Sequence, residues 1–436
     1  MENDAKREEA KWRRRNTDKF TSCARANRHW IAGAAVLMDM AFGTIQAWSV
    51  FRNPLMETFG WTMSEVTFAF TLHYSAVAVA ALLGGLWSVR VGSRAAGLVA
   101  GVLYGFGLLL ASLSANRLWV LYLSFGVMGG LGRGLGAIVA VATVVRWFPD
   151  RRGLVSGLTG IGFGAGAVVA APLAARLIPV VGALWTFALL GACCLLVVVV
   201  TALVMKDPPP GFNPPGWRPS EKPHLGRSSG SYTLVDALKT WQAYVLGALM
   251  FLNAVAGLGL VSQAAPMAQE LTRVDPLAAG GMVGLIAAAY AVGRFSWAWF
   301  SDILGRQRTF LALFLIQAVV FLSFPSVEAF SVFTSLAVLV LLCHGGGVGV
   351  MPATLADYFG PDNVGALLGL MLVAQCAGAG VGPMLLAFLR EVTGTYTLTL
   401  RIIAALMVGG GILSVLLRPP QGERLDPDIH ERARQG

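Results

Sequence analysis

The chain has 436 residues, of which 56% are hydrophobic and 13% are charged, and its mean hydropathy is +0.66. A soluble domain would have about 25% charged residues, so this composition excludes an ordinary soluble enzyme. The net charge of +10 comes from lysines and arginines that are scattered along the chain. Scattered basic residues do not form a nucleic-acid-binding face, so no nucleic-acid partner is expected.

Twelve apolar runs follow one another along the chain. Each is about 20 residues long and can therefore cross about 30 Å of hydrocarbon as a helix. The sequence predicts an all-α membrane protein with twelve transmembrane helices. These cover residues 30–51, 65–89, 95–114, 118–145, 154–178, 183–205, 243–264, 277–300, 310–327, 331–352, 364–389 and 396–417.

The basic residues predict the orientation of these helices. Most of the 33 lysines and arginines lie on one side of the membrane if both termini lie there too. Positive loops stay in the cytoplasm, so we expect both termini to be cytoplasmic. The basic stretch Lys11 to Arg15 is not followed by a short apolar core with a small-residue cleavage site. We therefore expect no cleaved signal peptide and a multi-pass protein of the cell (inner) membrane.

A polar segment, residues 206–242, divides the chain. It is rich in proline, glycine and serine, which predicts a solvated cytoplasmic linker. Two six-helix bundles, residues 30–205 and 243–417, are expected on either side of it. Residues 1–29 are predicted to be a basic cytoplasmic tail at the membrane surface, and residues 418–436 a second cytoplasmic tail.

The two predicted bundles resemble each other. The stretch from Trp147 to Gly157 matches the stretch from Tyr358 to Gly369, and Gly92 corresponds to Gly305 at nearly the same offset. An internal duplication of this kind places a substrate near the bilayer midplane, between two pseudo-symmetric halves that move against each other.

Arg294 is the best clue to function, because it lies inside the apolar run 277–300. An arginine at the centre of a membrane helix costs about 2.5 to 3.5 kcal/mol on insertion scales, so it is expected to face protein, water or an anionic ligand. Tyr290 precedes it by four residues and shares its helix face. A guanidinium fork and a tyrosine hydroxyl can together bind a carboxylate, which predicts a carboxylate-transport site.

Several segments, taken in order, resemble the major facilitator superfamily. Within it the chain resembles the oxalate/formate antiporter group, which is related to the monocarboxylate transporters. The resemblance implies two pseudo-symmetric six-helix bundles, transport by alternating access, and carboxylate binding by the arginine at the position of Arg294. The segments that carry it are Gly43–Phe51, Trp147–Gly153, Gly162–Gly164, Pro208–Phe212, the string around Arg294, and Met351–Gly360.

Two positions depart from the pattern of this group. Gln375 stands where oxalate-exchanging members have a lysine, and Gln46 stands where the family has a tyrosine. Glutamine donates hydrogen bonds but cannot neutralise a second carboxylate. The site is therefore expected to suit a monocarboxylate such as formate, lactate, glycolate or a keto acid. The alternative role for Gln375 is a hydrogen bond between helices.

Asp39 and Arg133 are predicted to lie near the membrane midplane, about 14 Å and 22 Å into their helices. The simplest hypothesis is that they form an ion pair, which leaves Arg294 as the sole uncompensated charge. Asp39 could then exchange its partner for a proton, which would make the carrier a proton symporter. If Asp39 is instead protonated at rest, Arg133 and Arg294 would form a two-cation clamp for a dicarboxylate such as oxalate. His344 is a further candidate, because the glycines at 345–347 would leave its ring room near the cavity.

Two short loops have the composition of conformational latches. One contains Arg90, Gly92 and Arg94, and the other contains Asp302, Gly305 and Arg306. A glycine permits the tight turn, and the charges can pair with neighbouring helix ends. The family has an acidic residue where this chain has Val89, so the first latch is expected to be weaker; alternatively, the arginines only set topology.

A small-residue face is expected between residues 157 and 166, where five glycines occur. Such a face lets helices pack closely, and it could also serve as a sliding gate interface.

The sequence contains no phosphate loop, no nucleophile with a positioned base and no cysteine or histidine cluster with metal spacing. We therefore expect no enzymatic activity, no cofactor and no metal. The expected partners are a small carboxylate, a proton or counter-anion, and the lipid bilayer, with a monomer sufficient for function. The alternatives are export of a larger amphiphilic compound and a membrane sensor that reports ligand through its basic tail.

Overall fold

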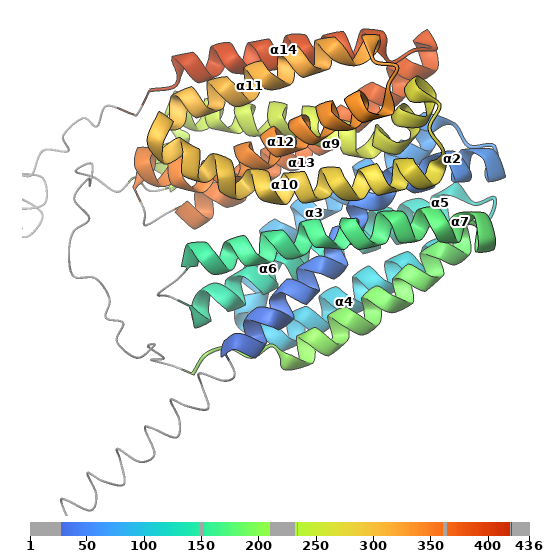
Figure 1. Ribbon diagram of the computed structural model, residues 1–436. Coiled ribbons are helices and arrows are strands. Elements are labelled where there is room, and N and C mark those ends of the chain that lie inside the picture. Colours follow the sequence, from blue (N-terminus) through green and yellow to red (C-terminus); the bar gives the residue numbers. More distant parts are fainter. Residues whose placement is uncertain are drawn as a thin grey trace, which may run out of the picture.

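The computed structural model describes residues 28–148, 152–209, 232, 234–360, 364–418 and 420. The predicted tails and most of the predicted linker lie outside the described residues. Helices of two halves, residues 28–209 and 234–418, run roughly side by side in Figure 1, the first half blue to green below and the second yellow to red above. We call these the N half and the C half.

The N half contains the first six spans. Its first helix covers residues 28–43 and continues through the 3-10 turn η1 (Thr44–Ala47) into α2 (Trp48–Phe59). The next spans are α3 (Met63–Val91) and α4 (Ser93–Ala111). The fourth span consists of α5 (Leu118–Leu121), the π-helix η2 (Tyr122–Gly129) and α6 (Gly130–Trp147). The long helix α7 (Arg152–Val204) holds the fifth and sixth spans.

The C half begins with the short helix α8 (Leu234–Leu238). It continues with α9 (Trp241–Thr272), α10 (Pro276–Leu304), α11 (Arg306–Ser323), η3 (Phe324–Ser326), α12 (Phe330–Phe359), α13 (Val364–Thr393) and α14 (Thr397–Leu416).

Eleven helices of the described residues are long and apolar enough to cross a membrane. One of them includes most of α7, which is interrupted at Gly182 by a backbone conformation of φ 84° and ψ 163°. Only glycine adopts such a conformation readily, so the chain turns there and α7 crosses twice. The all-α fold with twelve predicted spans is thereby confirmed.

We name the two ends of the bundle by the linker. The linker end carries Gly92 and Gly305, and the far end carries Gly60 and Arg273. The halves meet where α10 packs against α7, α13 against α3, and α2 against α9.

The predicted glycine face forms close contacts in two directions. Gly157, Gly160 and Gly164 of α7 face α10, whereas Gly162 and Gly166 face the first helix. A Cβ atom at Gly164 would lie 2.9 Å from the Ala287 carbonyl oxygen, and one at Gly166 would lie 2.0 Å from the Met40 carbonyl oxygen. Larger residues would therefore push these backbones apart.

Candidate functional site

Arg294 reaches from the C half to the N half. It lies in α10 about 15 Å from the linker end, which is within membrane depth. Its partly buried guanidinium lies over Gly160 of α7, where a Cβ atom would be 2.7 Å from Nη1 and 3.1 Å from Cζ. Among the described residues, no carboxylate forms a salt bridge with it. Arg294 thus lies at the boundary between the halves without a salt bridge among the described residues, although it acts electrostatically on Asp39.

Tyr290 lies beside Arg294, as the helical spacing predicts. The Arg294 Cζ atom is 6.0 Å from the centroid of the Tyr290 ring, and Tyr290 is buried. The His344 ring of α12 lies on Tyr290, with the two centroids 5.3 Å apart. The structure therefore brings these three predicted site residues together.

The environment of His344 differs from the expectation. Its Nδ1 atom lies 3.0 Å from the Asn253 carbonyl oxygen, while Nε2 is buried without a partner among the described residues. The adjacent glycines leave no open space: a Cβ atom at Gly345 would lie 2.1 Å from the Tyr290 carbonyl oxygen. The predicted room beside the ring is wrong, because α12 packs directly on α10 at these glycines. His344 contacts Tyr290 rather than a wide cavity.

Arg133 is sandwiched between two aromatic rings. Its Cζ atom lies 4.7 Å from the ring centroid of Tyr74 in α3 and 4.9 Å from that of Phe163 in α7. The Arg133 Nε and Nη1 atoms are buried without hydrogen-bond partners among the described residues. Phe163 in turn contacts Tyr290 edge-on, with centroids 6.4 Å apart. The rings of Phe163 and Tyr290 thus lie between Arg133 of the N half and Arg294 of the C half.

The predicted ion pair between Asp39 and Arg133 is not among the salt bridges of the described residues. Asp39 is buried, and its carboxyl group has Thr159 of α7 as a hydrogen-bond partner. Thr159 precedes Gly160, over which Arg294 lies, so Asp39 is held close to Arg294. Both arginines act electrostatically on Asp39, and Arg294 acts more strongly. In this conformation Arg133 lies between two aromatic rings, and a pair between Asp39 and Arg133 stays a prediction.

The two glutamines occupy different environments. Gln46 of η1 is buried, and its Oε1 atom has no partner among the described residues. Gln375 of α13 is partly buried and precedes Cys376, which lies within electrostatic range of Arg133. Whether either glutamine contacts a substrate stays a prediction.

The two latch loops adopt the same turn. Gly92 and Gly305 both have φ 85°, in the region that favours glycine. In the C half, Arg306 forms salt bridges of 2.7 Å with Asp302 and 2.8 Å with Asp357. In the N half, Arg94 donates to the Leu203 carbonyl oxygen at 2.5 Å. Arg90 is exposed on the same turn.

Asp207 supplies an acidic group that the sequence analysis missed. It forms a 2.9 Å salt bridge with Arg146 and accepts from the Ser93 hydroxyl at 2.7 Å and the Ser93 amide at 2.9 Å. The internal duplication could have indicated that an acidic partner is needed, because Arg146 aligns with Asp357, the acidic partner of Arg306 in the C half. The two halves therefore carry opposite charges at equivalent positions, and the acid of the N half comes from the residue after Lys206.

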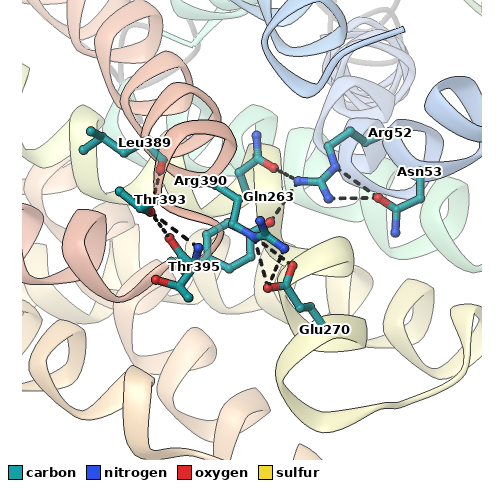
Figure 2. Close-up of polar contacts among 9 residues, drawn as sticks. Arg52, Asn53, Gln263, Glu270, Leu389, Arg390, Thr393 and Thr395 are labelled. Carbon is teal, nitrogen blue, oxygen red and sulfur yellow. Dashed lines mark hydrogen bonds and ion pairs between the residues drawn. The ribbon is translucent and has the colours of Figure 1, made fainter. Parts of the chain in front are cut away.

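At the far end, Arg52 closes the boundary between the halves (Figure 2). The residue is 5% exposed, although it lies just beyond the predicted span 30–51. Its Nη1 atom donates to the Gln263 side chain and, at 3.0 Å, to the Tyr396 hydroxyl, both of the C half. Its Nε and Nη2 atoms donate to Asn53 at 3.2 and 2.9 Å.

Further hydrogen bonds between the halves lie on the same side. Asn53 donates to Gln269 at 3.3 Å, the Ser64 amide donates to Glu391 at 2.8 Å, and Gln263 donates to Thr67 at 3.1 Å. Thr71 donates to the Gly380 carbonyl oxygen at 3.3 Å. Each of these hydrogen bonds between the halves lies in the far half of the bundle. This conformation is therefore closed at the far end.

Metal ligands are not grouped in this site. Among the described residues, no cluster of three or more histidine, cysteine, aspartate or glutamate side chains could hold a metal ion. The groups present are instead two arginines without salt bridges among the described residues, a tyrosine and a buried carboxyl group.

Comparisons with known proteins identify relatives over most of the chain. The family model of the Major Facilitator Superfamily matches residues 30–262 and 244–434. The uncharacterized transporter YhjX of Escherichia coli (strain K12) is 29% identical, over 80% of this chain and 83% of its own length. An oxalate:formate antiporter of Oxalobacter formigenes is 29% identical over 80% and 82%, and monocarboxylate transporter 13 of Bos taurus is 26% identical over 86% of each chain.

A solved structure shares the fold. The crystal structure of a bacterial homologue of the human lysosomal transporter Spinster superposes with a TM-score of 0.73 at 16% identity, covering 90% of this chain and 97% of that chain. The resemblance to oxalate/formate antiporters and monocarboxylate transporters is confirmed by the sequence relatives.

Proposed function

The chain belongs to the Major Facilitator Superfamily, and we propose that it is a secondary active carrier of a small carboxylate. The observation that carries this proposal is Arg294, an arginine at membrane depth that has no salt bridge among the described residues and lies against Gly160 of the other half. A carboxylate bound to its guanidinium would contact both halves, so binding would be coupled to their relative movement. We propose transport and no catalytic activity.

The substrate class follows from the groups around Arg294. The guanidinium can form two parallel hydrogen bonds with one carboxylate, and the Tyr290 hydroxyl can donate a third. Gln46 and Gln375 add amide groups but no charge. These groups match a monocarboxylate such as formate, lactate, glycolate or a keto acid. The printed functions of two relatives, oxalate:formate antiport and monocarboxylate transport, support a small carboxylate.

The direction of opening follows from the polar contacts. The positive-inside pattern favours a cytoplasmic position for both termini and the linker end, with the chain in the cell (inner) membrane and the far end facing outward. The hydrogen bonds that join the halves lie toward this outer side. We therefore propose that this state is closed to the outside, and that a monomer completes the cycle by opening at Arg52 while the linker-end loops close.

A dicarboxylate exchanger is the second candidate, and Arg133 favours it. Its Nε and Nη1 atoms are buried and have no partners among the described residues. A second carboxylate could bind these donors if Phe163 moved aside. The carrier would then use arginines from both halves, in place of the lysine that oxalate-exchanging members have at Gln375.

Uptake of labelled formate, lactate and oxalate into proteoliposomes tests the proposal, with wild type compared with Arg294→Lys. Lysine keeps the positive charge but cannot form the two parallel hydrogen bonds that a guanidinium makes with a carboxylate. Uptake is therefore expected to fall at least about tenfold. Arg308→Lys, at an exposed arginine of α11, is the matched control and should behave as wild type. Transport with no partner protein present would also count against a sensor.

The outcomes separate the candidates. Formate or lactate uptake that needs Arg294 and is driven by inward protons supports a monocarboxylate symporter. Oxalate exchange that is indifferent to a pH gradient supports the two-arginine exchanger. Uptake that Arg294→Lys leaves unchanged would overturn the site, and uptake of amphiphilic compounds alone would overturn the substrate class.

A further inference from the structure

Arg52 is a buried cation whose partners are all neutral. It is 5% exposed, and it donates only to the side chains of Gln263, Tyr396 and Asn53 in the described structure. A buried charge is normally paired with an opposite charge, because hydrogen bonds to neutral groups replace its hydration only in part. The positive charge of Arg52 is therefore not neutralised by its present partners and could be neutralised by a bound anion.

The nearby carboxylates are already engaged. Glu270 of α9 forms a 3.0 Å salt bridge with Arg390 of α13, and Figure 2 shows this pair beside the Arg52 network. Glu391 accepts hydrogen bonds from the amide and hydroxyl groups of Ser64. Neither carboxylate forms a salt bridge with Arg52 among the described residues, so an anion for Arg52 would have to come from outside the protein.

The partners of Arg52 are divided between the halves. Both groups that accept from Nη1 belong to the C half, Gln263 to α9 and Tyr396 to the turn before α14. Asn53, which accepts from Nε and Nη2, is the next residue of the same helix. When the halves separate at the far end, Nη1 loses both acceptors, while Asn53 stays and holds the guanidinium in place.

We propose that Arg52 is a second anion-binding site, which captures the carboxylate substrate when the outer side is open. The carboxylate oxygens would replace the Gln263 and Tyr396 oxygens at Nη1, and these two residues would displace the substrate toward Arg294 when the outer side closes. This inference rests on the proposed function and adds the position of first contact. One arginine thus serves as the recruiting site in one state and as part of the outer gate in the other.

The test is the external KM for uptake in right-side-out vesicles, measured for the best transported of labelled formate, lactate and oxalate. Arg52→Gln removes the charge but keeps a hydrogen-bonding side chain. It is expected to raise the external KM about two- to tenfold and to flatten its dependence on ionic strength, because a charge in an outer vestibule attracts an anion by a screened Coulomb interaction. Arg52→Lys should keep most of this dependence.

Two further variants separate recruitment from gating. Tyr396→Phe removes one gate hydrogen bond but leaves the Arg52 charge, so it should not raise the external KM. Arg117→Gln removes an exposed arginine at the same end of the N half and should leave both KM and its salt dependence unchanged. If Arg52→Gln does not reach the membrane, the comparison of Arg52→Lys with Tyr396→Phe decides: a raised KM in Tyr396→Phe and not in Arg52→Lys would point to gating alone.

An external KM and salt dependence that Arg52→Gln leaves at the wild-type values would overturn the inference. If Arg294→Lys still lowers uptake at least about tenfold in the same vesicles, the proposed function stands without the recruiting site. If Arg294→Lys is also without effect, both fail.

Discussion

Replacing Gly160 by alanine tests the site without changing any charged group. The new Cβ atom would lie 2.7 Å from Nη1 of Arg294, closer than real Cβ contacts allow, so one of the two groups must move. The guanidinium is the end of a flexible side chain, whereas the α7 backbone is fixed on its other face by the first helix. We therefore expect Arg294 to move by about 1 Å while the fold is retained.

The magnitude follows from this displacement. A misplacement of about 1 Å at a positioned group can cost about 100-fold in rate. For a binding arginine that keeps part of its contact, we expect the substrate affinity of Gly160→Ala to fall about 10- to 100-fold, which corresponds to about 1.4 to 2.7 kcal/mol. The thermal midpoint of the purified protein should change little, because alanine is a better helix former than glycine.

The assay compares KM, maximal uptake and thermal midpoint for three variants. Gly164→Ala should lower the thermal midpoint as well as uptake, because its Cβ atom would meet the Ala287 backbone at 2.9 Å. Gly281→Ala lies on α10 with nothing within 4 Å of its Cβ atom and should be neutral. Wild-type KM in Gly160→Ala would refute the placement of Arg294 as the substrate anchor, whatever the thermal midpoint.

Three other substitutions have defined outcomes. Asp39→Asn should abolish stimulation of uptake by an inward proton gradient while carboxylate exchange continues, and proton stimulation that survives would exclude Asp39 as the coupling group. Arg133→Gln should remove oxalate exchange if the two-arginine clamp operates, and it should leave formate and lactate uptake within about threefold of wild type if it does not. Asp207→Asn should lower the thermal midpoint by a few degrees, because it breaks a partly exposed salt bridge worth about 0 to 1 kcal/mol and weakens two hydrogen bonds to Ser93. An unchanged thermal midpoint would contradict this prediction, because it would show that the Asp207 contacts with Arg146 and Ser93 do not stabilise the fold.

The parts of the site that the sequence predicts are local along one helix. Arg294 and Tyr290 are four residues apart, so helical geometry alone places them on one face. The twelve spans also follow from local hydrophobicity, and the turns at Gly92 and Gly305 follow from composition. Each of these features depends on residues within about one helical turn or one span of each other.

The parts that the sequence does not predict depend on rotation about helix axes and on contacts between halves. Counting residues predicts the depth of Arg133 in its helix, but the π-helix Tyr122–Gly129 precedes it and shifts the helical register. Arg133 consequently faces Tyr74 and Phe163 rather than Asp39. Arg52 follows the predicted span 30–51, whereas its burial arises from contacts with Gln263 and Tyr396, more than 200 residues away.

The arginines at the linker end and those at the centre of the bundle have different kinds of interaction partner. This difference supports a carboxylate as a ligand of the central arginines. At the linker end, Arg146 and Arg306 have carboxylates within 3 Å. At the centre, Arg133 and Arg294 form no salt bridges among the described residues and lie 4.7 to 6.0 Å from aromatic rings. A cation–π contact is worth about 0.5 to 2 kcal/mol, whereas each hydrogen bond to a charged group is worth about 1.5 to 3 kcal/mol. A carboxylate with two such bonds would therefore displace a ring from either arginine, while the paired arginines of the latches would not exchange their partners as readily.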